Sequence, residues 1–148
     1  MTVFDLLTEY IRQGRIRLDR GRFPQRVAYH DPCNYGRKAQ ATFGHGFFEE
    51  PRWILGQCVE HWVDLYPDRM HQTCCGGGGG TLTTGYNEER LHYGRRKMEQ
   101  IRASGAEMVA VPCHSCHGQL EQLKSHHGMP ELEIKYLWEL VADALVVG

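Results

Sequence analysis

The sequence has no apolar run of about 18 or more residues, the length that a membrane-spanning helix needs. Its N-terminus carries Asp5 and Glu9 at positions where a secretory signal peptide would be basic and then apolar. We therefore expect a cytoplasmic chain with no segment inserted directly in a membrane.

The chain also has little net charge. With a formal charge of −1 and both signs mixed along the sequence, it offers no broad electrostatic attraction for nucleic acid or an anionic membrane surface. Its 148 residues amount to about one domain. We expect an N-terminal helix and link over residues 1–25 and a cysteine-rich domain over residues 26–148, which together form one compact unit and a fragment of a longer chain.

The chain has only six cysteines, and it is not the short, loop-rich scaffold that disulfides usually support. In a reducing compartment cysteines are more often metal ligands or redox groups. Five of them fall into three groups, which are Cys33, the adjacent Cys74 and Cys75, and the C-x-x-C of Cys113 and Cys116. Cys58 lies outside this pattern, on the apolar face of a short predicted helix, and is expected to be a buried apolar residue.

Five consecutive glycines, at residues 76–80, follow Cys75 directly. Glycine has no Cβ and adopts positive φ freely, so such a run costs much chain entropy unless the backbone must pass close to something. We expect that neighbour to be a metal cofactor, with the backbone of Gly76, Gly77 and Gly78 against it.

Predicted strands alternate with predicted helices. Strand-like runs lie at residues 26–30, 60–65, 108–112 and 132–136. Helical patterns lie at residues 2–13, 51–58, 87–104, 115–126 and 137–147, and residues 34–50 have the composition of a long loop. This alternation predicts an α/β fold with a parallel sheet of about four strands flanked by helices. Ligands of such sheets gather beyond the carboxyl ends of the strands, so the metal site is expected at that edge, where all three cysteine groups fall.

The spacing of the cysteines favours a multi-iron cluster over zinc. A structural zinc ion takes four ligands, usually from two C-x-x-C-like knuckles, and this chain has only one knuckle. Adjacent cysteines such as Cys74 and Cys75 tend to point apart, which suits separate irons of an iron–sulfur cluster better than one small ion. Zinc remains the alternative.

Two other interpretations apply to Cys113-His-Ser-Cys-His117. The string matches the C-x-x-C-H of haem c attachment, and a strand followed by C-x-x-C is typical of a thioredoxin-type redox pair. Covalent haem attachment takes place outside the cytoplasm, and neither interpretation gives a role to Cys33 or to the Cys74-Cys75 pair.

Three motifs carry a family resemblance: His30-Asp-Pro-Cys33, Cys74-Cys-Gly-Gly-Gly and Cys113-x-x-Cys116. They resemble the cysteine-rich CCG domain of the HdrB-type subunits of heterodisulfide reductase, and most of all the DsrK-type catalytic subunit linked to dissimilatory sulfite reductase. The resemblance implies a non-cubane four-iron, four-sulfur cluster at which a disulfide or trisulfide is reduced. The ligands it implies are Cys33, Cys74, Cys75, Cys113 and Cys116, and we add His30 as a candidate proton donor.

The resemblance also implies partners. They are a small sulfur-carrier protein of the DsrC type as substrate, an electron-donating iron–sulfur domain, and a membrane subunit that would hold the chain at the cytoplasmic face of a membrane complex. Relatives carry ferredoxin-like ligand runs that this sequence lacks, so the chain alone would have no electron path. We expect the pocket edge at residues 34–40 and 81–87. A structural zinc-binding or protein-interaction module without catalysis is the alternative function.

Overall fold

Four parallel strands form the centre of the protein. A computed structural model describes residues 1–148, and it confirms the predicted α/β fold with the strand order β2-β1-β3-β4. The strands are β1 (Val27–Tyr29), β2 (Trp62–Asp64), β3 (Met108–Val111) and β4 (Glu133–Tyr136).

The register of the sheet sets where the loops meet. Tyr29 of β1 pairs with Asp64 of β2 on one side and with Ala110 of β3 on the other. The carboxyl ends of these three strands therefore lie together at one edge. The inner strands β1 and β3 are buried along their whole length, as expected of parallel strands covered on both faces.

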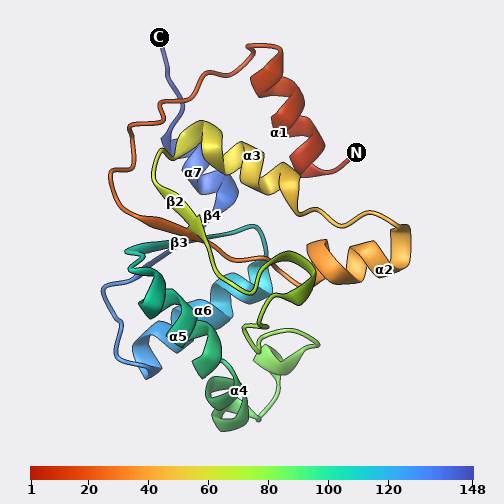
Figure 1. Cartoon of the computed structure of the whole chain (residues 1–148), viewed down its shortest axis with the longest axis vertical. Coiled ribbons are helices and arrows are strands. Elements are labelled where there is room, and N and C mark those ends of the chain that lie inside the picture. The colour runs from red at the N-terminus through yellow and green to blue at the C-terminus, as the bar shows by residue number, and fades with distance from the viewer.

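Helices cover both faces of the sheet (Figure 1). One face carries α1 (Val3–Arg12), α3 (Glu49–Cys58) and α7 (Leu137–Asp143), and the other carries α4 (Asn87–Tyr93), α5 (Arg95–Ser104) and α6 (His114–His126). The short α2 (Ala39–Phe43) lies to one side, next to α3 in the chain. None of these helices combines the length and the apolar character that crossing a membrane requires.

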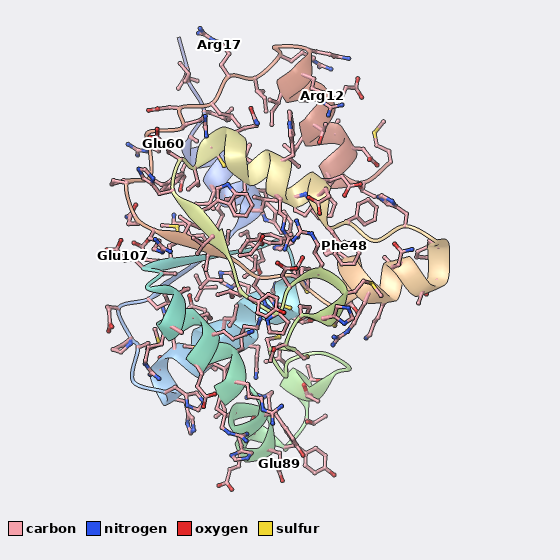
Figure 2. The ribbon with its side chains drawn as sticks, viewed as in Figure 1. Arg12, Arg17, Phe48, Glu60, Glu89 and Glu107 are labelled. Carbon is pink, nitrogen blue, oxygen red and sulfur yellow. The ribbon has the colours of Figure 1, made fainter.

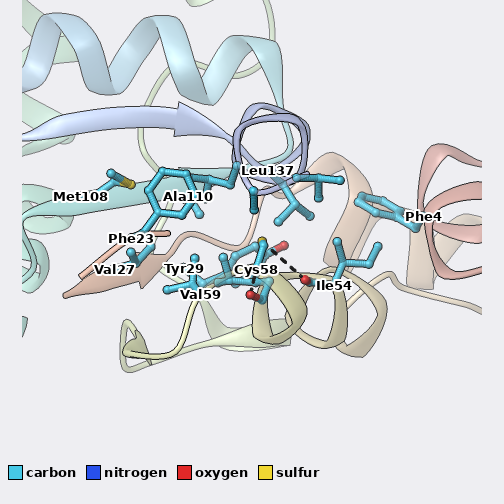
Figure 3. Packing of buried hydrophobic residues seen from close by; sticks show 14 residues of the cluster. Phe4, Phe23, Val27, Tyr29, Ile54, Cys58, Val59, Met108, Ala110 and Leu137 are labelled. Carbon is cyan, nitrogen blue, oxygen red and sulfur yellow. Dashed lines mark hydrogen bonds between the residues drawn. The ribbon is translucent and has the colours of Figure 1, made fainter. Parts of the chain in front are cut away.

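Alternate strand residues divide the interior into two cores. Val27 and Tyr29 point into a cluster with Ile54 of α3 and Leu137 of α7, which Figure 3 shows. Ala28 points the other way, into a cluster built mainly on α5 and α6. Each fully buried aliphatic side chain contributes about 1.5–3 kcal/mol.

The first 25 residues pack onto the rest of the chain. Thr2 caps α1, accepting a hydrogen bond from the Asp5 N–H, and Phe4 is fully buried in the first core. The link that follows pairs with the C-terminus, where Val146 N–H donates to the Arg17 carbonyl at 2.9 Å. The predicted helix at 137–147 is therefore too long, because the backbone beyond Asp143 bonds to this link instead of extending α7.

The predicted helix at 87–104 is two helices, so that prediction is wrong. The chain divides at Gly94, between α4 and α5. A Cβ at Gly94 would lie 2.9 Å from the Cys75 carbonyl oxygen and 2.4 Å from Leu123 Cδ2. This approach of backbone to backbone brings the start of α5 against the loop that holds Cys75.

The predicted loop at 34–50 is also more regular than expected. It begins with a π-helical turn at Asn34–Lys38, which leads directly into α2. Asp31 lies just after β1. It is buried and forms a two-bond ion pair with buried Arg52 of α3, at 2.8 and 2.6 Å.

The Asp31–Arg52 pair ties three elements together. Arg52 Nε also donates to Asp64 at the end of β2 (2.9 Å), and its Nη1 donates to the Phe48 carbonyl near the start of α3, where Figure 2 labels Phe48. Other charged side chains, such as Arg17 and Glu107, lie at the periphery (Figure 2). The buried pair thus fixes α3 to the edge of the sheet from which Cys33 follows.

We expect Arg52→Met to lower the free energy of unfolding by about 3–5 kcal/mol, because it leaves the Asp31 carboxylate buried without its partner. Urea denaturation followed by circular dichroism under reducing conditions measures this change. Arg20→Met is the control, since Arg20 is exposed and outside every ion pair, and it should change stability by less than about 0.5 kcal/mol. Equal effects of the two substitutions would contradict a structural role for the pair.

Candidate metal centre

The five cysteines meet at the carboxyl edge of the sheet. Cys33 follows β1, and Cys113 follows β3 as the residue before α6, which places Cys116 in the first turn of that helix. Cys74 and Cys75 lie in the loop between β2 and α4. The expectation that three distant groups gather at one edge is therefore correct in the structure.

The sulfur atoms form a continuous group. The Sγ atoms of Cys75 and Cys116 lie 3.5 Å apart, within hydrogen-bond distance for thiols. Thiol hydrogen bonds also join Cys33 to Cys74, Cys74 to Cys75, and Cys113 to Cys116. Cys75, Cys113 and Cys116 are buried, while Cys74 is exposed. Cys58 is separate: it is fully buried in the first core, and its thiol donates to the carbonyls of Ile54 and Leu55 in its own helix (Figure 3).

The environment divides the thiols into donors and acceptors of hydrogen bonds. Hydrogen bonds from Cys33 and Cys75 hold the pKa of Cys74 well below its ordinary value. A hydrogen bond from Cys116, helped by backbone N–H groups at the start of α6, lowers the pKa of Cys113 to about 6. The same bonds raise the pKa of Cys33 and Cys116. These hydrogen bonds favour the thiolate form of Cys74 and Cys113, which is the form that binds metal ions.

The glycines after Cys75 let the backbone pack closely against α6 and also bring it close to the sulfurs. Gly76 has a φ of 88° and donates its N–H to Cys74 Sγ at 3.3 Å. A Cβ at Gly77 would lie 2.5 Å from Gln119 Cβ, so its close neighbour is α6. Gly78 is the glycine whose Cβ position faces a ligand candidate, 3.7 Å from Cys33 Sγ. We expected all three to lie against a cofactor. Gly77 packs against α6 in the structure, and its backbone also hydrogen bonds to the Cys75 thiol.

A buried polar clamp holds the Cys75 backbone. Gln119 Nε2 donates to the Cys75 carbonyl at 2.8 Å and to the Arg90 carbonyl at 3.2 Å. Arg90 donates back to Gln119 Oε1, and its other nitrogen donates to Asn87 and Gln122. Sequence reasoning missed this clamp, because polar residues on α4 and α6 have the pattern of a solvated helix face.

A small cavity lies between the sulfurs. Its lining includes the five cysteines together with His30 and Gln72. A ring nitrogen of His30, Cys75 Sγ and Cys116 Sγ all lie within 4.8 Å of one another. His30 Nδ1 and both amide atoms of Gln72 are buried and have no hydrogen-bond partner. The five thiols are soft metal ligands, and the polar atoms around them lack hydrogen-bond partners. A thiophilic metal or cluster fits this site, because it would supply the missing partners.

Three histidines adjoin the cysteines in sequence or in space, and their surroundings differ. Burial holds the pKa of His30 well below its ordinary value, and nearby Lys97 acts in the same direction, so both favour the neutral imidazole. His114 and His117 lie against Tyr136, the first through a 2.6 Å hydrogen bond and the second by stacking at 4.2 Å. Only His30 therefore lies among the sulfurs, where it can donate a hydrogen bond.

Lys97 is a buried charged residue that no sequence pattern singles out. This α5 side chain is only 1% exposed and takes part in none of the ion pairs of the chain. Burial lowers its pKa to about 8, against the opposing effect of charge on Cys75 and Asp31.

Residues from both stretches of the expected pocket edge lie beside the sulfurs. Asn34 lines the sulfur cavity, and Tyr35 lines an open pocket beside Cys113. Tyr86 is 65% exposed and lines an open pocket beside Cys74.

Comparison with known proteins shows which family the chain belongs to. Residues 27–121 match the family model described as "CCG: Cysteine-rich domain". The chain is 34% identical over 140 residues to a "Probable membrane-anchored ferredoxin" of Chromohalobacter salexigens, covering 94% of this chain and 20% of that protein. It is 27% identical over 152 residues to "Hdr-like menaquinol oxidoreductase iron-sulfur subunit 2" of Archaeoglobus fulgidus, covering 98% and 26%.

A third relative is one of the subunits of the fumarate reductase (CoM/CoB) of Methanothermobacter marburgensis, 29% identical over 116 residues, which cover 78% of this chain and 22% of that relative. The chain thus spans between a fifth and about a quarter of the length of these relatives. No solved structure matches it significantly. The resemblance seen in the three cysteine motifs is confirmed, and the chain belongs to the CCG cysteine-rich domain family.

Proposed function

We propose that this chain is the cluster-binding domain of an Hdr-like oxidoreductase that reduces a disulfide or trisulfide bond. The cluster would be a non-cubane four-iron, four-sulfur cluster held by Cys33, Cys74, Cys75, Cys113 and Cys116. The observation that carries the proposal is the meeting of these five sulfurs around one cavity that also holds unpaired polar atoms. Support comes from relatives that are named as iron–sulfur proteins and oxidoreductase subunits.

The chemistry requires two electrons and two protons for each disulfide that becomes two thiols. A bound cluster supplies electrons singly and an iron that accepts a substrate sulfur. The chain contributes the surroundings: the Gly76 N–H donates to Cys74 Sγ, and the Gln72 amide and the His30 imidazole offer further hydrogen bonds. Such hydrogen bonds to sulfur stabilise the added negative charge of reduction.

Substrate would approach through the open pocket beside Cys74. This pocket has a volume of about 630 Å³, and Cys74 lines both it and the small sulfur cavity. Arg95 and Arg96 line it and form no ion pair with a carboxylate, while Tyr86 and Tyr93 provide exposed aromatic rings. Glu89 is its only carboxylate. These groups suit an anionic substrate end such as the C-terminal carboxylate of a flexible carrier arm.

We further propose a small sulfur-carrier protein of the DsrC type as substrate, as in DsrK-type relatives. The reductant would be an iron–sulfur domain that delivers electrons one at a time, with a membrane subunit in the same assembly. The name of the Chromohalobacter relative, a membrane-anchored ferredoxin, is consistent with this kind of neighbour.

A structural zinc site is the second candidate, and one distance favours it. The Cys75 and Cys116 sulfurs are 3.5 Å apart. Two thiolates on a tetrahedral zinc, each about 2.3 Å from the ion, would be about 3.8 Å apart. Zinc would leave one of the five thiols without a metal bond, whereas a multi-iron cluster can use all five.

Metal analysis after anaerobic reconstitution with iron and sulfide, in the presence of equimolar zinc, decides between the two. We expect about four irons and four acid-labile sulfides per chain. Cys74→Ser and Cys116→Ser should lower iron affinity by at least about tenfold, the loss typical even for residues that only support a metal ligand.

Cys58→Ser is the matched control and should keep the full iron content, because Cys58 bonds within α3 and lies outside the sulfur group. One zinc per chain without iron would contradict the proposed function. Equal iron loss in all three variants would show that the ligand set is wrong.

The pocket gives a separate prediction. Arg95→Gln combined with Arg96→Gln should weaken binding of a carrier C-terminal peptide by about tenfold, because each solvent-exposed arginine loses a pairing with the carboxylate worth about 0.2–1 kcal/mol. NMR titration of the cluster-loaded chain measures the dissociation constant. Arg102→Gln is the control, since Arg102 bonds to the His127 carbonyl away from the pocket. Unchanged binding by the double variant would remove this pocket as the substrate entrance.

A further inference from the structure

Lys97 is a buried cation without a dedicated anionic partner. A fully buried lysine is rare and costly unless an opposite charge lies near it. Lys97 is 1% exposed and belongs to none of the ion pairs. The nearby carboxylate of Asp31 is already paired in two hydrogen bonds with Arg52. The protein must therefore offset the charge of Lys97 in another way.

The placement of Lys97 on α5 directs it toward the sulfurs. Gly94 lies one turn earlier on the same helix face and meets the Cys75 carbonyl, so this face of α5 borders the cysteine loop. Side chains on a helix lean toward its N-terminal end, so the stem of Lys97 runs back over Gly94 toward that loop. In agreement with this direction, negative charge on each of Cys75, Cys116 and Cys74 raises the pKa of Lys97.

We propose that Lys97 is the built-in counter-charge of the metal centre: its ammonium group offsets the negative charge of the cysteine thiolates and their cluster and raises the potential at which the cluster is reduced. This rests on the proposed function. A cluster with five thiolate ligands is anionic, and each added electron makes it more so. A cation fixed in a region of low dielectric stabilises the reduced form more than the oxidised form. Lys97 is thus a positioning residue that acts through charge.

The test compares three variants after anaerobic reconstitution. Lys97→Met removes the charge and keeps an unbranched apolar side chain of similar length, Lys97→Arg keeps the charge, and Lys135→Met removes an exposed charge paired with Asp143. EPR-monitored redox titration gives the midpoint potential of each, and iron analysis gives the cluster content.

We expect Lys97→Met to shift the reduction equilibrium at least about tenfold toward the oxidised form, which is a midpoint potential lower by about 59 mV for one electron. Lys97→Arg should stay near the wild-type potential, and so should Lys135→Met. A wild-type potential in a fully loaded Lys97→Met variant would overturn the proposal, as would an equal fall in Lys97→Arg.

A failure to load the cluster is also informative. Replacement of a buried charge by an apolar side chain is often neutral or stabilising for a metal-free chain. A Lys97→Met chain that folds without metal but binds iron weakly, while Lys97→Arg binds it normally, supports the counter-charge role. Iron loss in both variants overturns it. Absence of iron from the wild-type chain would instead count against the proposed function, so the two failures are distinguishable.

Discussion

Five cysteine sulfurs from three distant parts of the chain must be held together against the cost of burying several groups that carry negative charge. A parallel sheet meets this requirement because the loops after β1 and β3 leave from one edge. The loop after β2 is brought to the same edge by contacts with α5 and α6. The close approach of α5 to the Cys75 backbone and the buried hydrogen bond from α6 to the Cys75 carbonyl both hold this loop beside the other sulfurs.

Two buried polar systems support the site from opposite sides. Asp31, which lies only two residues before Cys33, is paired with Arg52. This pair fixes α3 to the ends of β1 and β2. Gln119 and Arg90 fix the Cys75 carbonyl from α6 and α4. Because a buried polar group is costly when it loses its partner, each system holds its loop in one geometry. Rigid ligands of this kind limit how far the surroundings of a metal centre rearrange when its charge changes.

Sequence reasoning was sufficient for the strands, for the parallel sheet and for the convergence of the five cysteines, because apolar periodicity and the edge rule for α/β folds are local and general signals. It failed where long-range contacts decide. The break at Gly94 follows from contact with the Cys75 carbonyl, and the end of α7 follows from pairing with the link near Arg17. Lys97, Gln72 and Arg90 look in the sequence like ordinary surface residues, and only the packing of α4 and α5 against the loop places them inside. The ligand roles of the cysteines stay a prediction.

X-ray anomalous diffraction at the iron edge, from crystals of the reconstituted chain grown without oxygen, would locate the metal atoms of the proposed cluster. We predict about four iron sites between the strand ends and the glycine loop, with all five cysteine sulfurs of the site in bonding contact and none near Cys58. A single metal ion with four cysteine ligands, identified as zinc by its own absorption edge, would contradict this prediction.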